Sequence, residues 1–188
     1  MGGKGNGLVW ERREWFRVGT PVFMDVGVLH LLTNAYALWI VGPITERLYG
    51  SARFALLYLL SGVGGFVGSL LGSPNPLSPS AGSSGALFGL LGVLLVASYK
   101  YRHELTKPFR SALRKGALII ITINLAFGLL NNAGRLWGGR GSNVIHLVDN
   151  WGHVGGLLTG TFLAMILPYL APEKKYPSWL DKILLAGF

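Results

Sequence analysis

Cysteine is absent from this sequence. The chain therefore has no disulfide framework, no thiolate nucleophile and no cysteine-ligated metal site. Charged side chains are also scarce, at 13% of the residues, whereas a water-soluble domain carries about 25%. Hydrophobic residues make up 51% of the 188 residues, and the mean hydropathy is +0.45. This composition excludes an ordinary soluble domain and predicts an integral membrane protein.

Acidic residues are the scarcer of the two charge types. Asp and Glu number 8 against 17 Lys and Arg, which gives a net charge of +9. Basic clusters can bind nucleic acid, but here they alternate with apolar segments, a pattern that orients a protein in a membrane. We therefore expect the lipid bilayer, and no nucleic acid, among the partners.

Five apolar segments follow a glycine-rich start in which Trp, Phe and Arg are interleaved. About 20 helical residues cross a bilayer core of about 30 Å, so the first, second and fifth segments are long enough, and the other two need flanking residues. We predict an all-α, polytopic transmembrane helix bundle of about five spans, over residues 28–48, 54–72, 85–99, 116–130 and 151–170.

The basic residues also predict how the bundle lies in the membrane. If the first span runs from outside to inside, eleven of the 17 Lys and Arg residues fall on the inner side and six on the outer side. Cytoplasmic loops carry such an excess of Lys and Arg. We therefore expect residues 1–27 to form an interfacial external loop, residues 28–171 a transmembrane domain and residues 172–188 a cytoplasmic tail.

Glycines recur three or four residues apart along three of the spans. Small residues at this spacing let helix backbones approach closely, so we expect a compact bundle. The glycines concerned are Gly64, Gly68, Gly72, Gly85, Gly89, Gly92, Gly152, Gly156 and Gly160.

Four polar residues lie near the outer ends of the odd-numbered spans: His30, Asn34, Ser84 and His153. His30 and Asn34 are four apart and share one helix face, which must look into the bundle rather than at lipid. A serine nucleophile needs a base such as histidine, and Asn and His side chains can stabilise the charge that develops on an attacked carbonyl. The set therefore fits Ser84 as nucleophile, His153 as base, and His30 with Asn34 as stabilising donors.

Each of these residues also has a structural alternative. A serine beside glycine at a helix start is commonly an N-cap. His30 could be a core histidine, and Asn34 could join two helices by a hydrogen bond. Only the shared depth of the four residues favours a catalytic site.

A metal site is the competing use of the histidines. It would combine His30, His146 and His153 with Asp25 or Asp149. The chain has no HExxH motif or similar ligand spacing, so we predict no metal and no cofactor. Asp149 precedes His153 by four residues and could orient it as a triad acid, although an N-cap role for Asp149 or Asn150 is the one we expect.

The polar residues fall in three motifs that resemble those of the rhomboid intramembrane serine proteases. His30-Leu31-Leu32-Thr33-Asn34 resembles the HxxxN element, and Gly82-Ser83-Ser84-Gly85 resembles the GxSG element. His153-Val154-Gly155-Gly156-Leu157-Leu158-Thr159-Gly160 resembles the HxxGxxxG element. The likeness extends over residues 14–170, is closest to bacterial members, and is specific because the motifs occur in this order on successive odd spans.

The resemblance implies a serine endopeptidase that cleaves transmembrane segments of membrane proteins. Its active site would face the extracytoplasmic side of the cell membrane, and its C-terminus would be cytoplasmic. The resemblance assigns Ser84 rather than Ser83 as nucleophile and His153 as the base of a dyad without a required acid. His30, Asn34 and the backbone N–H of Ser84 would form the oxyanion hole. Supporting positions are Phe88, where a Tyr often stacks on the histidine, and Gly82, Gly156, Gly160 and Arg17.

The sequence departs from the family in two further ways. Asp25 stands where a histidine is common, which leaves the role of that position open. The family's core has six spans, and this sequence begins in the loop after the first, so we expect a truncated sequence rather than a five-span enzyme. The alternatives are a non-catalytic rhomboid-like protein that binds membrane proteins, and a small transporter lined by His30 and Asn34.

Overall fold

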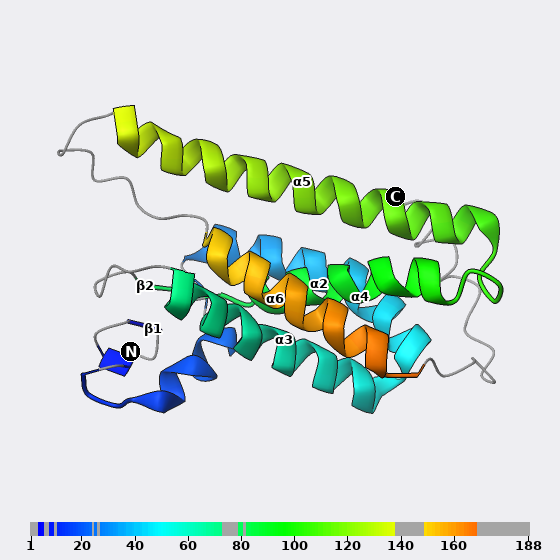
Figure 1. Ribbon diagram of the computed structural model, residues 1–188, viewed down its shortest axis with the longest axis horizontal. Coiled ribbons are helices and arrows are strands. Elements are labelled where there is room, and N and C mark those ends of the chain that lie inside the picture. Colours follow the sequence, from blue (N-terminus) through cyan, green and yellow to red (C-terminus); the bar gives the residue numbers. More distant parts are fainter. Residues whose placement is uncertain are drawn as a thin grey trace.

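The structure is a computed structural model that describes residues 4–5, 8–9, 11–23, 25, 27–72, 79–80, 82–137 and 149–168. The described residues form five long helices, as predicted for an all-α bundle (Figure 1). The predicted tail, residues 172–188, lies outside the described residues. The helices are α2 (Val28–Tyr49), α3 (Ser51–Gly72), α4 (Ser84–Lys100), α5 (Lys107–Trp137) and α6 (Asn150–Ile166).

The segment before α2 contains two short 3₁₀ helices, η1 (Trp15–Val18) and η2 (Thr20–Phe23). The two-residue strand β1 (Lys4–Gly5) pairs antiparallel with β2 (Pro79–Ser80), with Lys4 opposite Ser80. The start of the chain is therefore hydrogen-bonded to the connection that leads into α4.

The extents of α5 and α6 differ most from the sequence prediction. α5 begins at Lys107 rather than at residue 116 and continues to Trp137, because Lys and Arg are good helix formers and the helix is longer than its apolar part. α6 ends at Ile166 rather than at residue 170. Leu167 is extended, with ψ of 133°, and the proline that follows it disfavours the helical conformation there.

Three helices of the described chain are long and apolar enough to cross a membrane: α2, α3 and residues Lys107–Leu130 of α5. α4 is apolar but has only 17 residues, and α6 also has 17. All five helices thus occupy the positions predicted for spans, while length and composition alone qualify three of them.

α4 lies at the centre of the bundle and packs against α2, α3, α5 and α6. Of its 17 residues, 12 are buried. The outer helices instead expose large apolar side chains, such as Trp39 on α2, Phe127 on α5 and Phe162 on α6. In Figure 1, α5 runs along the upper edge and α3 along the lower edge, with α6 in front between them. Large apolar side chains exposed on the outer helices are what a protein that lies in lipid presents to the membrane.

Glycines bring α6 into backbone contact with α4. A Cβ added at Gly156 would lie 1.9 Å from the carbonyl oxygen of Gly85, and one added at Gly160 would lie 2.1 Å from that of Gly89. Only glycine allows helices to approach so closely. The contact between these two helices fixes how far the start of α6 stands from the start of α4.

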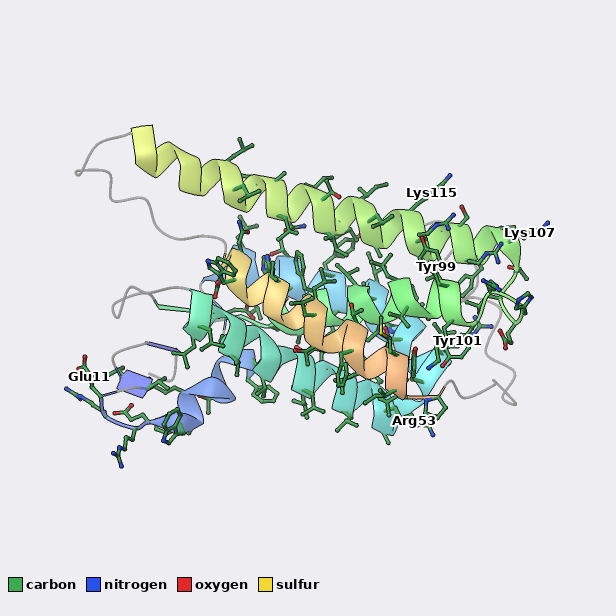
Figure 2. The ribbon with its side chains drawn as sticks, in the orientation of Figure 1. Glu11, Arg53, Tyr99, Tyr101, Lys107 and Lys115 are labelled. Atoms are coloured by element: carbon green, nitrogen blue, oxygen red, sulfur yellow. The ribbon has the colours of Figure 1, made fainter. Side chains whose placement is uncertain are left out.

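The opposite end of α6 is held by basic side chains. The Lys100 ammonium donates hydrogen bonds to the carbonyl oxygens of Ala164, Met165 and Leu167, and the Arg53 guanidinium donates one to Pro168. Positive charge is favourable at a helix C-terminus. Figure 2 shows Arg53, Tyr101 and Lys107 at this end of the bundle and Glu11 at the other.

Candidate active site

Ser84 is the first residue of α4, at the end of the bundle that carries η1 and η2. The N-cap position is held by Ser83, whose side chain makes no capping hydrogen bond. Gly82 precedes the two serines and has a φ of 136°, a backbone conformation that residues with a Cβ rarely adopt. The serines therefore do not cap α4 through their hydroxyls, contrary to the structural alternative for Ser84.

His153 lies in the first turn of α6. Asp149 is the N-cap of this helix, and its carboxylate accepts a hydrogen bond of 2.9 Å from the backbone N–H of Gly152. This is the N-cap role expected for Asp149. The Nδ1 atom of His153 is buried and has no hydrogen-bond partner among the described residues. Asp149 therefore orients the first turn of α6 rather than bonding directly to the imidazole.

The Ser84 hydroxyl and the His153 imidazole meet across α4 and α6. Ser84 Oγ lies 3.0 Å from His153 Nε2, and His153 is only 5% exposed. The ring of Phe88, one turn along α4, stacks on the imidazole with centroids 4.0 Å apart and planes inclined by 6°. When Nδ1 carries the ring proton, Nε2 accepts the serine hydrogen bond. The candidate nucleophile, the candidate base and an aromatic ring stacked on that base are thus brought together.

His30 and Asn34 converge on one carboxylate. His30 Nδ1 lies 2.8 Å from Asp25 Oδ1, and the Asn34 amide donates to the same oxygen over 2.6 Å. The sequence indicated that His30 and Asn34 share a helix face but left the role of Asp25 open. The available signal was an acidic residue close to His30 in a chain that has only 8.

Gly82 links the His30 side of the site to the serine side. A Cβ added at Gly82 would lie 2.6 Å from His30 Cε1, so the imidazole packs directly on the backbone two residues before Ser84. The starts of α2, α4 and α6 therefore meet at one place, as their shared depth predicted.

Arg17, the remaining supporting residue singled out from the sequence, lies in η1. Arg17 forms an ion pair with Glu14 in η1, and its guanidinium lies over the Phe16 ring. Within the described residues no three His, Asp or Glu side chains cluster as a metal site would require, and His146 lies outside them.

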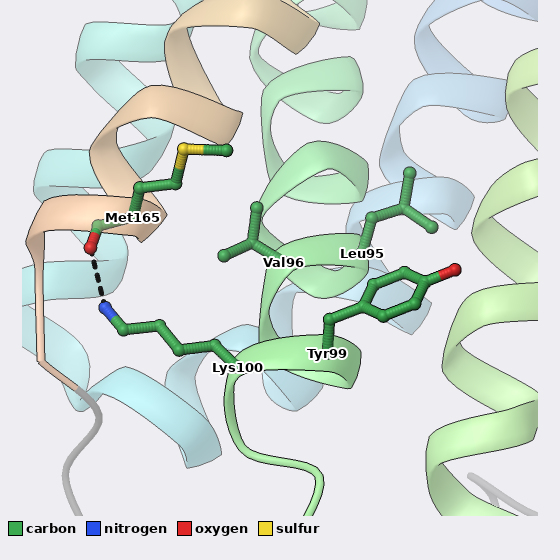
Figure 3. A pocket seen from close by; sticks show the side chains of 5 residues that line it. All are labelled: Leu95, Val96, Tyr99, Lys100 and Met165. Carbon is green, nitrogen blue, oxygen red and sulfur yellow. Dashed lines mark hydrogen bonds between the residues drawn. The ribbon is translucent and has the colours of Figure 1, made fainter.

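An apolar pocket lies at the far end of α4, lined by Leu95, Val96, Tyr99, Lys100 and Met165 (Figure 3).

Comparison with known proteins relates the chain to one family. The family model described as the rhomboid domain matches residues 12–170. Rhomboid protease GluP of Bacillus subtilis is 40% identical over 89% of this chain and 29% of its own length. Putative rhomboid protease YdcA of the same organism is 34% identical over 86% of this chain and 70% of its own length.

The relatives also include one that is named as inactive and others whose names state no activity. Inactive rhomboid protein 1 of Rattus norvegicus is 30% identical over 84% of this chain and 16% of its own length. RHOMBOID-like protein 1 of Arabidopsis thaliana is 35% identical over 94% of this chain and 40% of its own length. The chain thus spans less than half the length of these two relatives and of GluP, and similarity alone does not decide between a protease and an inactive relative.

Proposed function

The chain belongs to the rhomboid family, and from this premise we propose that it is an intramembrane serine endopeptidase acting through a Ser84–His153 dyad. Its substrates are transmembrane segments of membrane proteins. The observation that carries the proposal is the 3.0 Å approach of Ser84 Oγ to His153 Nε2, made between two different helices. A hydroxyl within hydrogen-bond reach of a base is the geometry that nucleophilic catalysis needs.

In the first step, Ser84 Oγ attacks the scissile carbonyl carbon, and His153 Nε2 takes the hydroxyl proton. The carbonyl π electrons move to oxygen and form a tetrahedral oxyanion. Donors from His30, Asn34 and the backbone N–H of Ser84 stabilise that charge, and one such donor is worth roughly 10²–10³ in kcat. The imidazolium then gives its proton to the leaving amine as the C–N bond breaks, which leaves an acyl-serine.

In the second step, His153 takes a proton from a water molecule, and the resulting hydroxide attacks the acyl-serine carbonyl. Collapse of the second oxyanion breaks the ester bond, and the His153 imidazolium gives its proton to the leaving Ser84 Oγ. Phe88 supports both steps because the stacked ring keeps the imidazole in one orientation. Water has to reach Ser84, which suits a site at the end of a helix rather than at the middle of the bilayer.

A substrate helix has to open before it can react. In lipid its backbone carbonyls are hydrogen-bonded within the helix, so the scissile carbonyl is accessible only where the helix unwinds. Small or helix-breaking residues near the scissile bond make unwinding easier. Such segments are the substrates we expect.

The proposed orientation places this site at the outer face of the cell membrane, with residues 1–27 on that face and the C-terminus in the cytoplasm. Basic residues support it, because Arg53, Lys100 and Lys107 lie at the end of the bundle opposite to Ser84 (Figure 2), and cytoplasmic loops are rich in Lys and Arg.

Two substitutions test the dyad. Ser84→Ala and His153→Ala are each expected to abolish cleavage of a membrane-anchored reporter and labelling by a fluorophosphonate probe, because each removes one half of the reacting pair. Ser83→Ala is the matched control and should keep both signals. Full activity in either dyad variant would refute the mechanism, and a wild-type chain that neither cleaves nor reacts with the probe would favour the non-catalytic alternative.

A further inference from the structure

Asp25 is the acidic side chain that contacts the candidate oxyanion donors. It lies just before α2, and its side chain is 10% exposed. A single oxygen of its carboxylate lies within hydrogen-bond distance of both His30 Nδ1, at 2.8 Å, and Asn34 Nδ2, at 2.6 Å. A poorly solvated carboxylate is costly unless it accepts hydrogen bonds, and these two donors meet that requirement.

The Asp25 carboxylate also determines which atoms of His30 and Asn34 face it. An ionised carboxylate only accepts hydrogen bonds, so the Asn34 atom that faces Asp25 has to be the amide nitrogen. For the same reason the facing nitrogen of His30 has to carry a proton. Asp25 therefore fixes both the amide orientation of Asn34 and the protonation of His30 at Nδ1.

These constraints determine what the two side chains can offer to a substrate. The Asn34 amide nitrogen has a second N–H that Asp25 Oδ1 does not take. With Nδ1 turned to Asp25, His30 can donate from Nε2 only as an imidazolium, and Asp25 is then its counter-ion. The Cε1 edge of the same ring packs on Gly82, two residues before Ser84, so the ring is held between the carboxylate and the serine segment.

We infer that Asp25 is a positioning residue for the oxyanion hole: by accepting hydrogen bonds from His30 and Asn34 it sets the donors that stabilise the transition state. The inference rests on the proposed function, since an oxyanion forms only if the chain is a serine hydrolase. Loss of the carboxylate should then slow the chemical step and leave substrate binding nearly unchanged, because the donors act on charge that develops after binding.

Two variants of Asp25 separate the hydrogen bonds from the charge. Asp25→Ala removes the acceptor, and kcat on a transmembrane reporter in proteoliposomes should fall roughly tenfold to a hundredfold, less than the full loss of a hole donor. KM should change less than about twofold. Asp25→Asn keeps an oxygen at the same position without the charge and should recover part of kcat. Glu11→Gln, an exposed acid at the same end of the bundle, is the control and should match wild type.

A second readout does not depend on turnover. In protein labelled with ¹⁵N-histidine, the His30 ring signals, assigned by their loss in His30→Gln, should shift in Asp25→Ala and in Asp25→Asn because the partner of Nδ1 has changed. The thermal midpoint of each variant is measured alongside, and Asp25→Asn carries the test if Asp25→Ala does not fold.

The outcomes distinguish this inference from the function on which it rests. A wild-type kcat in Asp25→Ala, a loss confined to KM, or unchanged His30 signals in both variants would overturn the role of Asp25 while leaving the Ser84–His153 dyad intact. A wild-type chain without cleavage or fluorophosphonate labelling would overturn both.

Discussion

His153 is constrained on several sides, and each constraint comes from a different residue. Nε2 faces the Ser84 hydroxyl at 3.0 Å, the ring lies flat against Phe88, and the turn that carries the residue is capped by Asp149. A phenyl ring cannot donate a hydrogen bond, so Phe88 acts on the histidine only through contact and orientation. Loss of that contact should therefore lower kcat without abolishing cleavage.

Phe88→Ala tests the stacking contact. Aromatic pairs contribute about 0.5–1.5 kcal/mol beyond burial, so we expect kcat to fall roughly twofold to tenfold when the imidazole loses its stacked neighbour. Phe88→Tyr keeps an aromatic ring at the same place and is the matched control, with kcat close to wild type. Reporter cleavage by the purified variants measures both, and equal rates for Phe88→Ala and wild type would contradict an orienting role.

At the scale of helices, the contact between α4 and α6 decides whether the dyad can form. The backbones touch where Gly156 meets Gly85 and where Gly160 meets Gly89. The proposed nucleophile and base are carried by these same two helices, so any side chain placed in the contact would move one away from the other. The glycine spacing thus sets, through packing, how closely the two residues of the proposed dyad approach each other.

Gly156→Ala tests this contact. The new methyl group would lie 1.9 Å from the Gly85 carbonyl oxygen, and relieving such an overlap typically costs about 1–3 kcal/mol. We expect a lower unfolding temperature in detergent together with reduced reporter cleavage. Leu158→Ala is the control, since Leu158 is 64% exposed on the same helix and its truncation creates no clash. A Gly156→Ala protein as stable and active as wild type would argue against the contact.

At the scale of the whole molecule, the two ends of the bundle differ in charge and in content. One end carries the site, η1 and η2, and the other carries Lys100, Lys107 and the Lys100 contacts with α6. The proposed topology puts the first end outside the cell and the second in the cytoplasm. A protease of this orientation would cut its substrates on the extracytoplasmic side.

The absence of cysteine makes the orientation directly testable. Glu11→Cys and His103→Cys would each introduce the chain's single thiol at an exposed position. A membrane-impermeant maleimide should label Glu11→Cys in intact cells, and it should label His103→Cys only after permeabilisation, because the membrane shields the cytoplasmic end. The reverse pattern would show that the site faces the cytoplasm.

Hydropathy and residue order alone determined that the chain is a bundle of membrane helices and that His30, Asn34, Ser84 and His153 share one end of it. Those properties can be read from each segment by itself, because its length and its direction across the membrane fix the depth at which its residues lie. Apolar character did not predict the extents of α5 and α6, because it does not mark where a helix begins or ends.

Only the tertiary structure decided which faces of the helices turn toward one another. The approach of Ser84 to His153, the stacking of Phe88 and the convergence of His30 and Asn34 on Asp25 each depend on how helices rotate and how closely they approach. Side-chain packing and the glycine contacts between α4 and α6 set that rotation and spacing, and neither can be calculated from depth alone.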